Sequence, residues 1–135
     1  MSALSDHMEQ QLINCTLRGG TYTGSVVYVA LHESDPTDAA LTNTEVTDSG
    51  YNRQQAHTAS PSDGFTSPVN GSTTNTKIIQ YPAIIDQTIV VTHWALWDSS
   101  TGGNLILHEA MTNPKTLDAT DVMSFPVGSI SITAL

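Results

Sequence analysis

The sequence has very little cysteine, with Cys15 alone among 135 residues. A single cysteine cannot form an intrachain disulfide, and it cannot by itself make a cysteine metal site from this chain. Cys15 lies near the end of a predicted helix, where the helix dipole disfavours a thiolate. We interpret it as a small apolar residue rather than a nucleophile, and nothing else in the sequence requires an oxidising compartment.

Basic residues are also scarce. The sequence has four Lys and Arg residues and thirteen carboxylates, which gives a formal net charge of -9. Binding to nucleic acids or to anionic membranes depends on clustered Lys and Arg. The four basic residues are scattered along the chain, so the composition argues against both kinds of partner. We expect an acidic surface and no nucleic-acid or membrane partner.

Long apolar runs are absent, and none approaches the ~20 residues of a membrane span. The start "MSALSDHMEQ" has neither a basic segment nor an apolar segment of a signal peptide. We therefore expect no membrane anchor and no export by that route. The length suits one domain with a single core.

A helical pattern is present at the N-terminus. Apolar residues recur at helical spacing, Asp6 and Glu9 fit a capping box, and "RGG" at 18–20 provides a stop. The apolar face is formed by Leu4, Met8, Leu12, Ile13 and Leu17. We predict a helical arm over residues 1–20 and propose Leu4, Met8, Leu12 and Leu17 as residues that bind a partner.

After Gly20 the sequence is typical of β structure, with short β-branched and aromatic runs between polar turns. It predicts an antiparallel β-sandwich or jelly-roll domain over residues 21–135. In the last run, Ile130 and Ile132 are expected to face the core, with Ser129 and Ser131 facing away. The segment 58–76 is expected to be a surface loop with a little strand. The expected strands cover residues 26–32, 51–58, 76–79, 88–97, 104–111, 122–125 and 129–134.

Two segments echo each other, "VYVALHESDP" at 27–36 and "THWALWDSST" at 92–101. Both run through Ala-Leu into an acidic turn that contains serine. We interpret the echo as similar chemistry at two strand ends, although an internal duplication is an alternative. One short echo is weaker than the sustained period of a repeat protein.

The stretch "YVALHESDPTD" at 28–38 contains residue types found in hydrolase and metal sites. In an extended chain, successive side chains point to opposite faces, so His32 and Ser34 diverge from Glu33 and Asp35. Asp35-Pro36 is also a common turn opening. We interpret the stretch as a strand that leaves its sheet, with an acidic loop of Glu33, Asp35 and Asp38 that touches a neighbouring subunit. A hydrolase built on His32 would need a second histidine or carboxylate nearby.

No metal-binding motif is recognisable among the histidines of the predicted strands, because none has a partner at ligand spacing. These histidines are His32, His57, His93 and His108. Trp94 and Trp97 could stack on a sugar, but residues three apart in a strand lie on opposite faces. We expect one of the two in the core and the other at a surface or interface. We predict no metal, no cofactor and no catalytic residue.

Several short motifs occur along the sequence in a characteristic order. In sequence they are "LRGGTYTG", "VYVALHESDPTDA", "TEVTDSGYNRQ", "SPSDG", "THWALWDSSTGGNLILHEAMTNPKTL" and "VGSISIT". From about Leu12 to the C-terminus, this series resembles a family of small tailed-phage virion proteins commonly labelled tail fibre proteins. The sequence departs from that pattern at residues 42–44, where relatives tend to have glycine.

The resemblance implies a non-enzymatic structural protein of the virion that is made in the host cytoplasm. Related β-sandwich proteins with an N-terminal arm serve as capsid cement or decoration proteins, often as trimers. We expect such a protein here, bound to the major capsid protein and to copies of itself at the capsid surface. The alternative is a tail or tail-fibre component that contacts other tail proteins or a host glycan.

Overall fold

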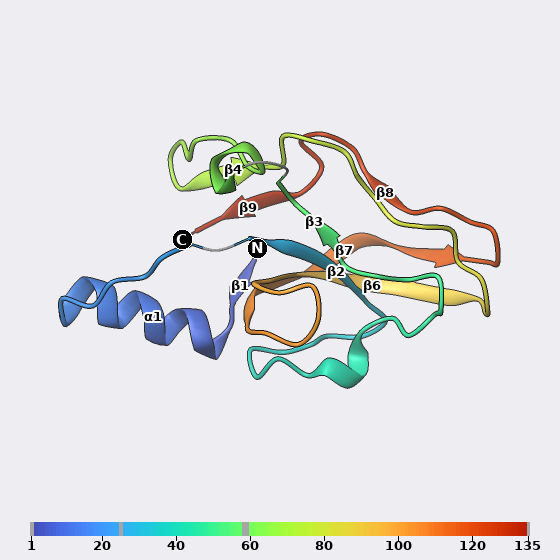
Figure 1. Cartoon of the computed structure of the whole chain (residues 1–135), viewed down its shortest axis with the longest axis horizontal. Helices are drawn as coiled ribbons and strands as arrows, with labels where there is room; N and C mark the ends of the chain where they lie inside the picture. The colour runs from blue at the N-terminus through green and yellow to red at the C-terminus, as the bar shows by residue number, and fades with distance from the viewer. Residues whose placement is uncertain (1, 25, 58–59, 135) are drawn as a thin grey trace.

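The protein is described by a computed structural model over residues 2–24, 26–57 and 60–134. Most of its regular structure is β, in antiparallel sheets that form a sandwich-like body, and one short α-helix lies near the N-terminus (Figure 1). The predicted all-β fold class is therefore confirmed. Within the described part of the chain, no helix is long and apolar enough to cross a membrane.

The main sheet has five strands in the order β1-β7-β6-β2-β3. In the centre of this sheet, β2 and β6 pair antiparallel, with Ala30 opposite Ala95 and His32 opposite His93. Most of the residues of both strands are buried, since the sheet is covered on both faces. The strand bounds are Ala3–Leu4 for β1, Tyr28–His32 for β2, Gln54–Gln55 for β3, Ile89–Trp97 for β6 and Leu105–Leu117 for β7.

The turn that joins β6 to β7 consists of residues 98–104. Asp98 organises it, because its Oδ1 accepts a hydrogen bond from the Asn104 amide at 2.7 Å and its Oδ2 accepts one from Asn104 Nδ2 at 2.8 Å. Gly103 has φ +76° in this turn, and an added Cβ would lie 2.4 Å from Asp98 Oδ1. Only glycine fits there without strain.

The β6–β7 pairing is interrupted by a bulge. Val91 pairs with Lys115 and His93 with Ala110, so residues 111–114 of β7 lie opposite Thr92 alone. Bulges bend a strand and increase its twist. This one leaves the middle of β7 outside the regular ladder.

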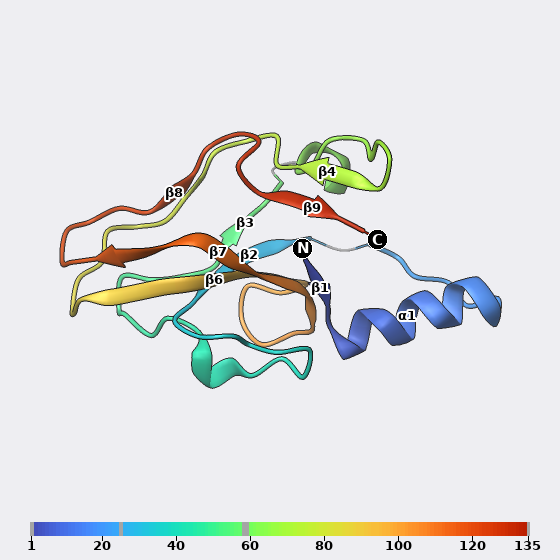
Figure 2. The same cartoon turned by 180° about the vertical axis from the view of Figure 1, so that it is seen from behind.

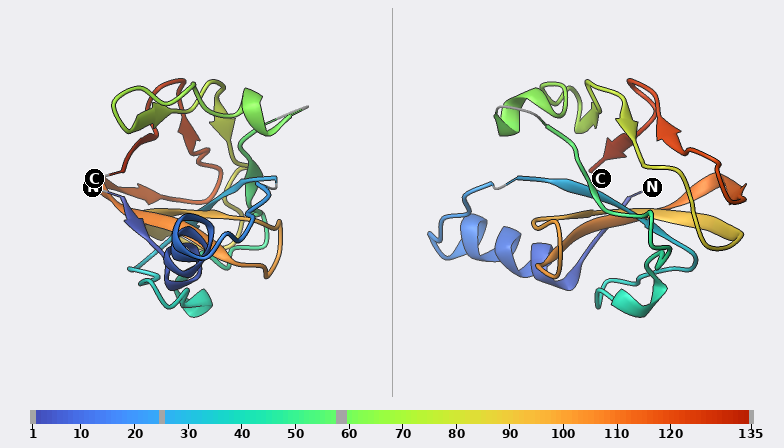
Figure 3. Two further views of the ribbon diagram at one scale, coloured as in Figure 1. Left: turned by 90° about the vertical axis from the view of Figure 1, so that its left-hand side faces the viewer. Right: turned by 45° about the vertical axis from the view of Figure 1, so that its right-hand side comes forward.

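The second layer consists of two short ribbons that lie over one face of the main sheet (Figures 2 and 3). In one ribbon, β4 (Ser72–Thr74) pairs with β9 (Ser131–Thr133), and in the other, β5 (Ile79–Gln80) pairs with β8 (Ser124–Phe125). The main core lies between the layers. Its largest buried members include Leu31, Ile79, Tyr81, Trp94, Phe125 and Ile130.

A smaller core lies on the other face of the main sheet, formed by Ala30, Ala95, Trp97 and Leu105 with Ala40 packed against it. Ala30 and Ala95 are opposite each other in the β2–β6 pair. Their small side chains lie where the loop that contains Ala40 covers the sheet. The two similar segments thus form neighbouring strands, β2 and β6, whose alanines are covered by the same loop on the same face of the sheet.

The predicted strands agree with the structure best where they are long. The prediction of 88–97 is close to β6, whereas β7 extends six residues beyond the predicted end at 111. Only Gln54–Gln55 of the predicted strand 51–58 is a strand, and Thr58 lies outside the described residues. Ile130 is buried and Ser129 and Ser131 are exposed, as predicted.

The helix α1 covers Asp6–Leu17, and its cap differs from the prediction. Ser5, not Asp6, is the N-cap, and its Oγ accepts a hydrogen bond from the Met8 amide at 3.2 Å. The predicted glycine stop is present, since Gly19 has φ +68° and the Gly20 amide donates to the Asn14 carbonyl at 2.9 Å. Short 3-10 turns cover Thr42–Thr44 (η1) and Pro61–Asp63 (η2).

Candidate interaction surfaces and a buried polar network

The helix α1 extends away from the β-sandwich (Figures 1 and 2), and none of its residues is buried. The predicted partner-binding residues are placed accordingly. Leu12 is 53 % exposed, Leu17 is 79 % exposed, and Met8 is half-buried. Leu4 precedes the helix in β1 and is 37 % exposed. The helix thus presents an apolar surface that the described part of its own chain does not cover.

The base of the arm is fixed firmly to the sheet. Ser5 is fully buried, its Oγ donates to the Leu105 carbonyl, and its amide donates to the Ile106 carbonyl at 3.1 Å. Next to it, the Asp6 amide donates to the Asp38 carbonyl at 3.1 Å. These contacts fix where the arm leaves the sandwich, so the helix has a defined origin.

His108 of β7 lies between two aspartates of the loop that follows β2. Its Nδ1 is 3.2 Å from Asp35 Oδ1, and its Nε2 is 3.0 Å from Asp38 Oδ1. Asp35 and Asp38 were predicted to touch a neighbouring subunit. In the structure they contact this chain's own His108, seventy residues away from Asp38 in sequence.

His32 does not lie in an open site. Strand β2 ends at His32, which is fully buried, whereas Glu33, Ser34 and Asp35 are exposed. The interpretation of a strand that leaves its sheet is therefore confirmed. Burial lowers the pKa of His32 to about 4, despite the opposing charge of Glu45. His32 Nδ1 is hydrogen-bonded to Thr44 Oγ1 at 2.8 Å, and a substrate would have no access to the ring.

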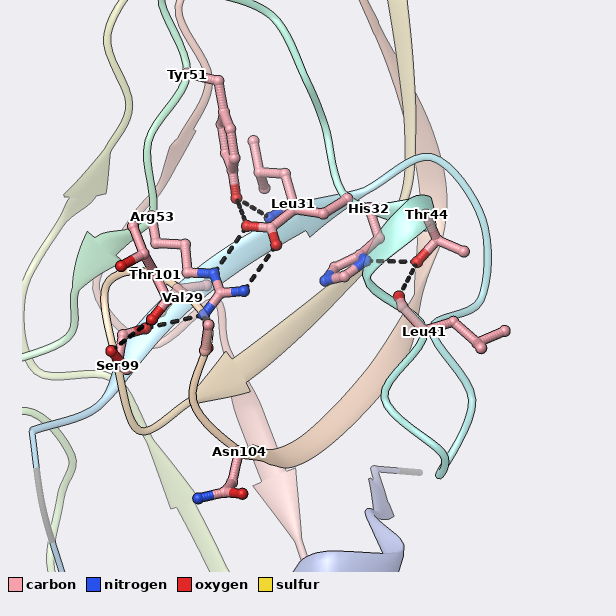
Figure 4. Close-up of polar contacts among 12 residues, drawn as sticks. Val29, Leu31, His32, Leu41, Thr44, Tyr51, Arg53, Ser99, Thr101 and Asn104 are labelled. Atoms are coloured by element: carbon pink, nitrogen blue, oxygen red, sulfur yellow. Dashed lines mark hydrogen bonds and ion pairs between the residues drawn. The ribbon is translucent and has the colours of Figure 1, made fainter.

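Arg53 is the centre of a buried polar network (Figure 4). Its Nε and Nη2 donate to the two oxygens of Glu45, each at 2.8 Å. Its Nη1 donates to the carbonyls of Ser99 and Gly102 at 2.9 and 2.8 Å. The guanidinium lies 4.1 Å from the centre of the Trp97 ring, a cation–π contact. Arg53 thereby joins the segment after η1, the residues just before β3, and the β6–β7 turn.

Tyr51 extends this network toward the main core. Its hydroxyl donates to Glu45 Oε1 at 2.8 Å and accepts from the Leu31 amide at 3.0 Å. Its ring stacks on Tyr81, whose hydroxyl donates to the Val29 carbonyl at 2.9 Å. Burial alone would raise the pKa of Glu45, but the hydrogen bonds and the charge of Arg53 outweigh it and hold this pKa below its ordinary value. The sequence prediction missed the network, because its members are gathered from separate loops.

The two tryptophans lie on opposite faces of β6, as predicted: Trp94 is in the main core and Trp97 in the smaller one. The prediction that one of them lies at a surface or interface is wrong. Trp94 is 6 % exposed and Trp97 is 1 % exposed. A sugar-stacking platform needs an exposed ring face, so these side chains do not provide one in this conformation.

Histidines and carboxylates do not assemble into a metal site in the described part of the chain, where no group of three possible ligands is found. His57 accepts a hydrogen bond from the Val27 amide at 3.3 Å, and His93 Nδ1 lies 2.8 Å from Thr92 Oγ1. Both are held by groups of their own domain. Cys15 is a free, half-buried cysteine on α1.

A cleft of about 630 Å³ lies between β7 and the β8–β9 side of the second layer. Its floor is apolar, with the buried side chains Trp94, Leu117, Met123 and Phe125. Its rim is polar and includes Thr112, Asn113, Ser124 and Ser131. The cleft thus offers an apolar base with hydrogen-bonding groups around it.

One comparison with known proteins gives a match. A family model described as "Podophage GP4 fiber I protein gp80" matches residues 3–133. The match spans the helical arm, both layers of the sandwich and the polar network. No curated protein matches the chain.

Proposed function

Because the chain belongs to the podophage GP4 fiber I protein gp80 family, a family of phage structural fibre proteins, we propose that it is a fibre component attached to the virion through its helical arm. The role is structural and uses no catalytic residue. The observation that carries the proposal is α1 itself, which leaves a fixed base and presents an uncovered apolar face.

The partner of α1 is another virion protein with an apolar groove. A helix of 12 residues is marginal by itself in water, so burial of its apolar face against a partner adds stability. The first turn of α1 carries Asp6 and Glu9. A groove with basic residues near that turn complements these two carboxylates.

A capsid cement protein is the second candidate, in which three copies bridge neighbouring major capsid subunits. The arm supports this role too, because its fixed base and exposed face allow it to reach an adjacent subunit. A protein that binds only the assembled shell stabilises that state by mass action. Microscopy of virions with an antibody to this protein separates the two candidates: label on fibres supports the first, and label over the head supports the second.

Two variants of the arm test the attachment. Met8→Asp and Leu12→Asp place charges on the apolar face, and we expect both to abolish incorporation into virions, because a buried unpaired charge opposes binding. The measurement is the amount of the protein in purified particles. Thermal unfolding should stay close to that of the unmodified protein, since neither side chain belongs to the core.

The matched controls are Ile78→Asp and Val127→Asp, which place the same charge on apolar residues of the sandwich that are each 60 % exposed. These controls should be incorporated normally. Normal incorporation of Met8→Asp and Leu12→Asp would refute attachment through α1.

A further inference from the structure

The cleft beside β7 is an open seam between two strands. One wall is the outer edge of β7, the edge that does not pair with β6. The other wall is β8, which pairs only with β5 among the described strands. Figure 1 shows β7 and β8 bordering this side of the sandwich. Beyond its pairing with β1, residues 110–117 of β7 have no strand neighbour on the outer side in the described chain.

This edge of β7 already accepts a strand within the chain. On it, β1 pairs antiparallel, with Ala3 opposite His108 and Leu4 opposite Leu107. The seam continues the same edge by eight residues, 110–117. An edge strand is a template for pairing with a further strand, and a strand added there would continue the line of β1 along β7.

The residues around the seam match an extended peptide. In a strand, alternate side chains point to opposite faces. One face would lie on the apolar floor of Trp94, Met123 and Phe125, and the other would lie among polar groups such as Thr112 and Ser124. On the outer edge, residues 110–117 of β7 have no strand partner among the described strands. The backbone of an added peptide would pair with their free N–H and C=O groups.

We propose that this seam binds an extended segment of a second, different virion protein, which adds as a strand antiparallel to β7. The inference rests on the proposed virion role. The bound segment alternates apolar and polar residues. Its N-terminal end lies near Asp118 and Asp121 in the turn that follows β7, and a basic residue there complements the two exposed carboxylates.

A second copy of this chain fits the seam less well. The seam has a wall on each side, so it admits a lone strand and not the edge of another sheet. The terminal strands of the described chain are already paired, β1 with β7 and β9 with β4. Two copies also repel each other through a net charge of -9 on each chain.

Hydrogen exchange tests the proposal on the unmodified protein. Amide exchange is measured by mass spectrometry for the isolated protein and for the same protein in purified virions. The proposal predicts that amides of residues 110–113, 115–117 and 122–125 exchange more slowly in the virion. The amides of Ser72–Thr74 in β4, which lie outside the seam, serve as the internal reference.

Variants that block the seam provide a second test. Ser124 of β8 lines the cleft, and its antiparallel partner Gln80 of β5 does not, although both are exposed. Ser124→Trp should fill the seam and abolish the virion-dependent slowing, whereas Gln80→Trp should keep it. Equal slowing in both variants overturns the proposal.

Each remaining outcome is also decisive. Seam exchange that is unchanged in virions overturns the strand addition and leaves the virion role standing. Absence of the protein from virions overturns the virion role and the inference with it. Slow seam exchange in the concentrated isolated protein identifies a second copy as the occupant, which overturns the choice of a different protein.

Discussion

Arg53 and Glu45 form a bidentate ion pair whose side chains are 4 % and 15 % exposed. Such a pair must be fully hydrogen-bonded to offset the free energy of removing two charges from water. Here the guanidinium also donates to two carbonyls of the β6–β7 turn and contacts Trp97. The pair therefore sets the relative positions of three segments that have no regular pairing with one another.

Removal of the Arg53 side chain should be costly. We expect Arg53→Ala to lower the free energy of unfolding by about 3–5 kcal/mol, because Glu45 then stays buried without its partner. Arg53→Lys should recover only part of this loss, since an ammonium cannot make the bidentate contact. Urea unfolding measures both changes.

The control is Arg18→Ala at an exposed position after α1, which should change the free energy of unfolding by no more than about 0.5 kcal/mol. Similar losses for Arg18→Ala and Arg53→Ala would contradict the role assigned to the network.

His32 makes the stability depend on pH. Its folded-state pKa is lowered to about 4, whereas an unfolded chain has a histidine pKa near 6.5. Between these values the unfolded state binds a proton that the folded state does not, so stability falls as the pH falls through this window. Glu45 adds a separate loss at lower pH, as protonation passes through its lowered folded-state pKa.

Between about pH 7 and about pH 5, we expect His32 to remove about 2 kcal/mol from the free energy of unfolding. His32→Gln removes this titration and keeps a polar group near Thr44 Oγ1. Urea unfolding of the unmodified protein and of His32→Gln at both pH values gives the comparison. An equal loss in both proteins would exclude His32 as the source.

At the scale of elements, α1 differs from the strands because its stability comes from its base and not from a packed face. Ser5 carries that base, through its cap on Met8 and its bonds to β7. Ser5→Ala should lower the free energy of unfolding by about 1–2 kcal/mol, since a cap and a partner of the Leu105 carbonyl are lost.

Leu12→Ala, on the exposed face of the same helix, should change it by no more than about 0.5 kcal/mol in the isolated protein. Thermal unfolding compares the two variants. A larger effect of Leu12→Ala would show that the face is covered by the domain itself.

Element lengths explain which strands could be predicted. The long apolar run of β6 has a strong β pattern, and its prediction was nearly correct. Strand β1 has two residues, which is too short for a periodic signal, whereas β4 is the little strand expected within residues 58–76. The end of β7 was also missed, because "TNPKTL" contains Asn and Pro and is typical of a turn. A bulge and an exposed edge accommodate these residues.

At the scale of the whole molecule, the interaction surfaces lie on different parts of the fold. The arm leaves the sandwich at the start of β7, and the seam follows the rest of that strand. Both depend on β7, whose inner edge pairs with β6 and whose outer edge holds β1. One long strand therefore connects the attachment element to the proposed peptide site.

The sequence by itself determined the fold class, the helix with its apolar face, and the absence of an intrachain disulfide. These follow from local periodicity and composition, which need no knowledge of distant contacts. It also indicated that His32 to Asp35 do not converge, because adjacent residues diverge in an extended chain.

Only the tertiary structure decided which residues meet. His108 with Asp35 and Asp38, Arg53 with Glu45 and Ser99, and the burial of both tryptophans depend on segments far apart in the chain. The open seam is decided in the same way, because a strand edge is free only when no other segment pairs with it. Such outcomes arise from the packing of the layers, which local patterns do not encode.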